Sequence, residues 1–212
     1  MKRIIIIIFG VLFCISSLIA QDQKTTGTIE DAFKAIKAKD YVKAVTLYNE
    51  VIKINTVYSP AYYGRGLGLF YQSQYLPALN DFDKAITLDE KYGDAYFARG
   101  VCYVELNNLT SAVSDFQKAA DLKPDMAEIY YAWGNALYIK SDYEKAIAKY
   151  GKAIEKNNKY ADAYYGRAAC FRLMKNNTAA LTDFQKYISL AGENAEMADE
   201  AHRMIDLINE GR

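Results

Sequence analysis

The sequence predicts an all-α chain built from helical hairpins. Three observations carry the prediction: a period of 34 residues, small residues at two fixed positions of that period, and one polar break inside every repeat. The five repeats are 25–58, 59–92, 93–126, 127–160 and 161–194. Two segments of helical period flank each break, so each repeat is expected to fold as two antiparallel helices.

Small residues mark where the two helices of a repeat should meet. Numbering each repeat from its first residue, position eight is glycine or alanine, and position twenty is always alanine. The residues at position eight are Ala32, Gly66, Gly100, Gly134 and Ala168. Helices approach closely only where side chains are small. Aromatic residues dominate positions four and twenty-four, where they are expected to fill the space beside that contact.

The chain starts with the features of a secretory signal. Lys2 and Arg3 precede an apolar run, and polar residues follow Ala20. Residues 1–20 are therefore predicted to be a signal peptide, followed by a short linker over 21–24, and the protein is predicted to be periplasmic or secreted. A short uncleaved membrane anchor is the alternative, because the apolar run is at the lower length limit for a membrane span.

Composition argues against several classes of function. Lysine plus arginine and aspartate plus glutamate are both 26, which gives no electrostatic basis for binding nucleic acid. The one histidine, His202, has no cysteine or carboxylate cluster around it in the sequence and is interpreted as a surface residue. No nucleophile–base pair or metal cluster emerges. The chain is therefore expected not to be an enzyme and to need no cofactor or metal.

The repeats are expected to end in a capping helix within residues 195–212. Apolar residues lie on one face of this segment and charged residues elsewhere. The apolar face consists of Met197, Ala201, Met204 and Ile208. A polar outer face is what a stack of repeats needs at its end.

The repeat pattern resembles the tetratricopeptide repeat (TPR) family. The third repeat carries the resemblance best, through Tyr96, Gly100, Tyr103, Ala112, Phe116, Ala119 and Pro124. The resemblance implies a right-handed superhelical solenoid whose first helices line a concave groove. It also implies a protein-binding module.

An arginine–aspartate pattern supports the repeat register. Position seven is arginine and position twenty-three is aspartate in the second, third and fifth repeats, which predicts the pairs Arg65–Asp81, Arg99–Asp115 and Arg167–Asp183. In the fourth repeat the same positions hold Trp133 and Lys149. Since position seven is arginine only in the repeats where position twenty-three is aspartate, a repeated structural ion pair is expected.

The positions that face the groove in the TPR family are aromatic or apolar here, with acidic residues toward the second half. The predicted partner-binding residues are Tyr63, Leu67, Phe70, Tyr71, Asp94, Phe97, Val101, Glu128, Tyr131, Asn135, Tyr138, Asp162 and Tyr165. Such a groove suits a helix or an extended peptide with aromatic or aliphatic anchors and some basic residues. The same aromatics could instead be packing residues between repeats.

Together these features predict an exported interaction module that binds a peptide or helix of a partner protein. Two alternatives stay open: a scaffold subunit of a cell-envelope complex that uses its ends or convex face, and a carbohydrate-binding module that stacks its aromatics on sugars. A homo-oligomer is also open. Contact with a membrane is expected only through the N-terminal segment, if that segment is uncleaved.

Overall fold

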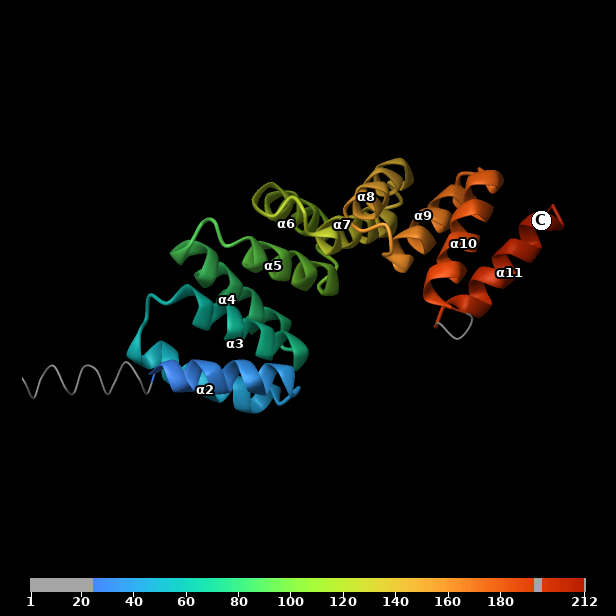
Figure 1. The fold of residues 1–212 in the computed structure, drawn as a ribbon. Helices are drawn as coiled ribbons and strands as arrows, with labels where there is room; N and C mark the ends of the chain where they lie inside the picture. Colours follow the sequence, from blue (N-terminus) through green and yellow to red (C-terminus); the bar gives the residue numbers. More distant parts are fainter. Residues whose placement is uncertain (1–24, 193–195, 212) are drawn as a thin grey trace, which may run out of the picture. The chain divides into compact units, whose positions relative to one another are not determined.

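The computed structural model describes residues 25–192 and 196–211 (Figure 1). The chain divides into two compact units between Glu90 and Lys91. In the first unit, helical residues 25–37 precede α2 (Tyr41–Ile54), α3 (Ser59–Tyr71) and α4 (Tyr75–Leu88). The second unit contains α5 (Gly93–Glu105), α6 (Leu109–Leu122), α7 (Ala127–Ile139), α8 (Tyr143–Lys156), α9 (Ala161–Leu173), α10 (Asn177–Ala191) and α11 (Ala198–Asn209). The predicted signal peptide and linker lie outside the described residues.

Within each unit, successive helices pack against one another. In the first unit α2 packs on α3 and α3 on α4, and in the second unit each helix from α5 to α10 packs on the helix that follows it. The described residues contain helices and turns and no strand. The predicted all-α fold of helical hairpins is confirmed.

The glycine of position eight lets the two helices of a hairpin meet. A Cβ atom placed on Gly100 would lie 2.7 Å from Cε1 of Phe116, and one on Gly134 would lie 2.6 Å from Cε1 of Tyr150. Both rings are almost fully buried. The position is therefore small because an aromatic ring of the second helix lies directly on the backbone of the first.

A tyrosine at position four fixes the loop that enters its hairpin. The hydroxyl of Tyr62 donates a hydrogen bond to the carbonyl of Thr56, six residues earlier. Tyr130 and Tyr164 donate to the carbonyls of Pro124 and Asn158 at the same spacing. These bonds satisfy loop carbonyls, which explains why position four is tyrosine in these three repeats.

Each hairpin turn contains one residue with left-handed backbone geometry. The residues are Lys39, Ser73, Asn107, Ser141 and Lys175, with φ between 56° and 62°. The amide of the following residue then reaches the carbonyl five residues earlier, as in the bond from Asp142 to Leu137 at 2.9 Å. This closes the first helix and starts the second within very few residues.

Replacing Ser141 by glycine is expected to stabilise the chain by about 0.5–1 kcal/mol, because glycine adopts positive φ without steric cost. Chemical denaturation followed by circular dichroism measures the change. As a control, Lys118→Gly in the middle of α6 should lower stability by about 1 kcal/mol. Equal losses in both variants would contradict the role assigned to the turn.

The last helix closes the second unit. Ala201 and Ile208 of the predicted apolar face are buried, and Met204 packs against the same cluster on α9 and α10. Met197 is 38% exposed and precedes the helix. In the part of the chain that the structure describes, every helix is too short or too polar to span a bilayer.

Candidate partner-binding site

The aromatic residues of position five pack against buried rings of their own hairpins. The ring centroids of Phe97 and Phe116 lie 5.9 Å apart, and those of Tyr165 and Phe184 lie 5.5 Å apart. Tyr63 makes the corresponding contact with Phe82 in the first unit, at 6.1 Å. One side of each ring therefore serves packing, and any binding role belongs to the side that remains exposed.

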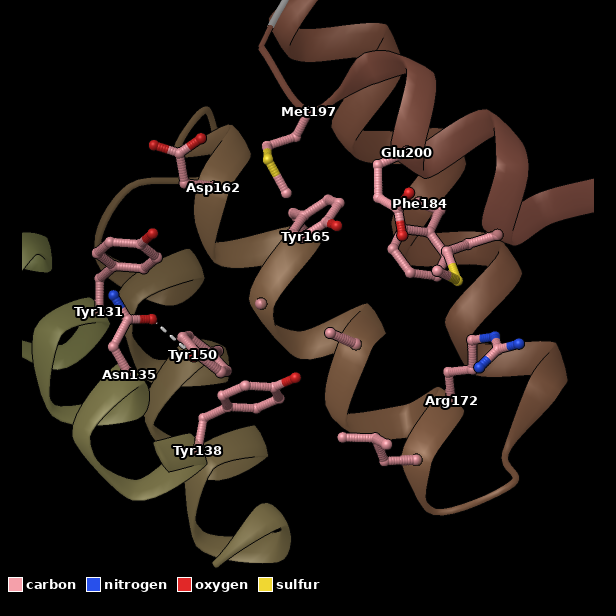
Figure 2. A pocket seen from close by; sticks show the side chains of 14 residues that line it. Tyr131, Asn135, Tyr138, Tyr150, Asp162, Tyr165, Arg172, Phe184, Met197 and Glu200 are labelled. Atoms are coloured by element: carbon pink, nitrogen blue, oxygen red, sulfur yellow. Dashed lines mark hydrogen bonds between the residues drawn. The ribbon is translucent and has the colours of Figure 1, made fainter. Parts of the chain in front are cut away.

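In the second unit, Tyr131 and Tyr165, the position-five rings of the fourth and fifth repeats, line a cavity of about 500 Å³. Residues from α7, α8, α9, α10 and α11 line it, together with Met197. The lining residues are Tyr131, Asn135, Tyr138, Tyr150, Asp162, Tyr165, Gly166, Ala169, Arg172, Leu173, Phe184, Met197, Glu200 and Met204. Figure 2 shows Tyr131 and Tyr138 on one side of the cavity and Met197 and Glu200 on the other.

Small residues of α9 leave the space open. Gly166 and Ala169 lie one helical turn apart on the face that lines the cavity. A Cβ atom on Gly166 would lie 2.7 Å from Cζ of Tyr150, so this position has no room for a side chain. The Tyr150 hydroxyl donates a hydrogen bond of 2.7 Å to Oδ1 of Asn135, which fixes the ring at the base of the cavity (Figure 2).

The wall of the cavity is apolar and rich in phenol groups. Burial raises the pKa values of Tyr131, Tyr138 and Tyr165, so all three hydroxyls are neutral at physiological pH. Tyr138, Leu173 and Met197 are 37%, 48% and 38% exposed and form an accessible rim. The cavity can hold an apolar side chain and offer hydroxyl groups to the backbone that carries it.

Charged groups border the cavity on two sides. Glu200 accepts hydrogen bonds from Arg203 at 2.6 and 2.8 Å, and these bonds lower the pKa of its carboxyl group. Asp162 is exposed. The Nε atom of Arg172 is buried and has no hydrogen-bond partner among the described residues. Asp162 is thus the border carboxylate best placed to meet a cation of a ligand.

Neither a reactive thiol nor a metal-binding cluster occurs beside the cavity among the described residues. The buried thiol of Cys170, on α9, has its pKa raised by burial to about 12, so it is protonated and unreactive. In the same part of the chain, no three histidine, cysteine, aspartate or glutamate side chains come together in a way that could hold a metal ion. The lining of tyrosine, methionine and phenylalanine side chains suits binding by shape and polarity.

The structure brings five of the predicted groove residues together at this cavity. They are Tyr131, Asn135, Tyr138, Asp162 and Tyr165. The remaining residues of the second unit do not line it: Phe97 packs on Phe116, and Asp94 forms an ion pair with Lys123 at 2.5 Å. Val101 and Glu128 also lie outside the lining.

The other predicted groove residues belong to the first unit, and none of them lines the cavity. They are Tyr63, Leu67, Phe70 and Tyr71. Tyr71 is 54% exposed, stacks on Tyr41 at 4.7 Å and meets the edge of Phe70 at 5.5 Å. These contacts form an aromatic cluster within that unit. Whether it binds a partner stays a prediction.

Sequence reasoning missed most of the far wall of the cavity. It assigns Tyr150 and Phe184 to packing alone, and Met197 and Met204 to a capping face, whereas all four line the cavity. A pattern in the sequence could have identified Tyr150: where position twenty-four is tyrosine, position six of the next repeat is glycine, as in Tyr48–Gly64 and Tyr150–Gly166. Phenylalanine at that position is followed by alanine, as in Phe116–Ala132.

The three predicted arginine–aspartate pairs are in direct contact. Arg65 Nη2 lies 2.6 Å from Asp81 Oδ1, and Arg65 Nε lies 2.7 Å from Asp81 Oδ2. Arg99–Asp115 and Arg167–Asp183 repeat this two-point geometry. The carboxylates are only 4–5% exposed. The pairs join the two helices of a hairpin away from the candidate site.

Comparisons with known proteins agree with this architecture. A family profile described as "TPR repeat" matches residues 102–140 and 134–175, and one described as "Tetratricopeptide repeat" matches residues 162–192. The chain therefore contains TPR repeats in its second unit. No curated protein matches the chain.

Solved structures of TPR proteins share the fold. The protein YrrB, described as "a TPR protein with an unusual peptide-binding site", is 22% identical, with a TM-score of 0.69 over 83% of this chain and 90% of that chain. MamA from Desulfovibrio magneticus RS-1 is 18% identical, with a TM-score of 0.72 over 79% and 94%. The TPR protein TTC0263 of Thermus thermophilus is 18% identical, with a TM-score of 0.68 over 86% and 100%. The chain has the fold of a TPR protein, and that fold supports a protein–protein interaction module.

Proposed function

We propose that the protein is an exported, non-catalytic interaction module whose second-unit cavity binds a peptide or helix of a partner protein. The observation that carries the proposal is a cavity of about 500 Å³ lined by four tyrosines, one phenylalanine and two methionines. A volume of this size accommodates a large side chain and part of its neighbour. Tyrosine supplies contact area with little loss of conformational entropy, because it has few rotatable bonds.

The cavity suggests what the bound segment contains. An aliphatic or aromatic side chain would fill the space between Tyr138 and Tyr165, where an apolar ligand replaces water. A lysine or arginine nearby in the segment would meet Asp162 at the border. The peptide-binding site named for YrrB shows that a protein of similar fold can bind a peptide, which supports the proposal by analogy only.

Export is proposed from the sequence of residues 1–20 alone. The charged start and the apolar run are typical of a secretory signal, and cleavage would leave Gln21 as the first residue. Mass spectrometry of the protein from its native cells tests this directly. An intact chain that still contains residues 1–20 would favour the membrane-anchored alternative.

A peptide library displayed on phage, selected on the immobilised chain, tests the proposed binding. Enriched peptides are expected to share one large apolar residue and a nearby basic residue. Their affinity should fall at least tenfold for Ala169→Phe, which fills the cavity from α9 without removing a buried side chain. Ala191→Phe, at the exposed end of α10, is the matched control and should bind normally.

Peptides that bind both variants equally would place the binding surface elsewhere and favour the scaffold alternative. A glycan array on the same two variants separates the third class of function. Glycan binding that Ala169→Phe removes, with no peptide enriched, would replace the peptide by a carbohydrate as the ligand.

A further inference from the structure

A second cavity, of about 510 Å³, lies in the second unit where the fourth repeat departs from the arginine–aspartate pattern. Its lining comes from α6, α7, α8 and the turn between α7 and α8. The residues are Thr110, Val113, Trp133, Leu137, Lys140, Asp142, Lys145, Ala148 and Lys149. None of them lines the candidate partner-binding cavity.

The second repeat contains the same hollow with a different charge. Its lining, of about 350 Å³, shares six repeat positions with the hollow of the fourth repeat, at residues Val45, Arg65, Leu69, Pro77, Asn80 and Asp81. There the charges cancel, because Arg65 binds Asp81 at two points and also donates to Asn49 at 2.7 Å. Comparison with the second repeat shows what differs in the fourth: Trp133 and Lys149 stand where the second repeat has Arg65 and Asp81.

The hollow of the fourth repeat is positively charged. Lys140, Lys145 and Lys149 line it, against the single carboxylate of Asp142, which lies 3.5 Å from Lys145. Lys140 donates a hydrogen bond to the Thr110 hydroxyl at 3.3 Å. Three ammonium groups against one carboxylate give the lining a net charge of about +2, which attracts an anion. Asp121 lies outside the lining, and its negative charge, which acts on Lys149, reduces this excess without reversing it.

Lys149 is the group that most needs a counter-ion. Its Nζ atom lies 3.4 Å from the centre of the Trp133 ring, and no ion pair to it occurs among the described residues. Burial lowers the pKa of its ammonium group, and the negative charge of Asp121 opposes the shift. The aromatic face compensates only part of the lost hydration of a cation.

We propose that this basic hollow binds a phosphate group, either free or carried by a monoester such as a phosphorylated side chain, held by Lys140, Lys145 and Lys149. The dianionic charge of such a group is opposite to the positive charge of the lining. Lysines bind phosphate as point charges, so three of them around one hollow suit a multiply charged anion. The proposal does not depend on peptide binding at the other cavity.

The only tryptophan of the chain reports on the site, because Trp133 forms its wall beneath Lys149. Inorganic phosphate and O-phosphoserine are titrated into the full chain at constant ionic strength, with tryptophan emission and calorimetric heat recorded. Both signals are expected to saturate, since an anion that draws Lys149 from the ring changes the surroundings of the indole. Phosphoserine that binds more tightly than inorganic phosphate identifies a phosphorylated side chain as the source, and the reverse order identifies free phosphate.

Lys140→Gln/Lys145→Gln keeps the reporter and should weaken binding at least tenfold. Lys118→Gln, on an exposed face of α6, is the charge-matched control and should bind normally. Trp133→Arg/Lys149→Asp rebuilds the pair of the other repeats and should abolish the calorimetric signal in a folded chain. Absence of both signals, equal binding by acetate, or unchanged binding in either double variant would overturn the proposal.

Discussion

Arg167→Met is expected to lower the free energy of unfolding by about 3 kcal/mol, at the lower end of the range for breaking a buried ion pair. Asp183 is 4% exposed and receives both of its side-chain hydrogen bonds from Arg167, at 2.7 and 2.9 Å. Removing the guanidinium leaves a buried carboxylate with neither water nor a cation. The Arg167 side chain is 24% exposed, which limits the loss.

Urea denaturation of the variant chains measures this effect. Arg167→Met/Asp183→Leu should recover much of the lost stability, because it removes the stranded charge together with its partner. Arg203→Met breaks the exposed pair with Glu200 and should cost no more than about 1 kcal/mol. Equal losses for Arg167→Met and Arg203→Met would show that the buried pair contributes no more than a surface pair.

Gly166→Ala is expected to cost about 1–3 kcal/mol, because the added methyl group overpacks the contact between α9 and the buried Tyr150 ring. The added Cβ would lie 2.7 Å from Cζ of Tyr150. The ring cannot retreat easily, because its hydroxyl is bonded to Asn135 at 2.7 Å and is buried. The same substitution also reduces the open volume beside the ring and should weaken peptide binding.

Tyr150→Phe releases the ring from Asn135, so Gly166→Ala should cost less in that background than in the wild-type chain. The sequence already pairs phenylalanine with alanine at these positions, in Phe116 and Ala132. Gly151→Ala, where the nearest atom to the added Cβ is 3.6 Å away, should be neutral or stabilising by up to about 1 kcal/mol. A double-mutant cycle without coupling between residues 150 and 166 would contradict this packing account.

The repeat period predicts the fold well because each column of the alignment has one dominant physical cause. Gly134 is small because a ring lies on it, and Ser141 is polar because the chain reverses there with positive φ. These constraints are local to a hairpin and recur in every repeat. The same packing contacts are therefore encoded five times in the sequence, once in each repeat.

The candidate site was less predictable, because it depends on contacts between different repeats and the last helix. Tyr131 and Tyr165 occupy the same repeat position as Phe97, yet only the two tyrosines line the cavity. The difference comes from Gly166 and Ala169 on α9, which leave the space open, and from Met204 on α11, which borders it on the other side. Nothing in the period of a single repeat specifies how the capping helix meets two earlier repeats.

The most direct test of the central claim is photo-crosslinking in cells from a benzophenone residue placed at Tyr138, on the rim of the cavity. The account predicts adducts with a partner segment that carries a large apolar residue, adducts that Ala169→Phe removes and Ala191→Phe does not. The same probe at Tyr71, in the first unit, should not capture that segment. Adducts at Tyr138 that persist at full yield in Ala169→Phe would contradict binding in the cavity.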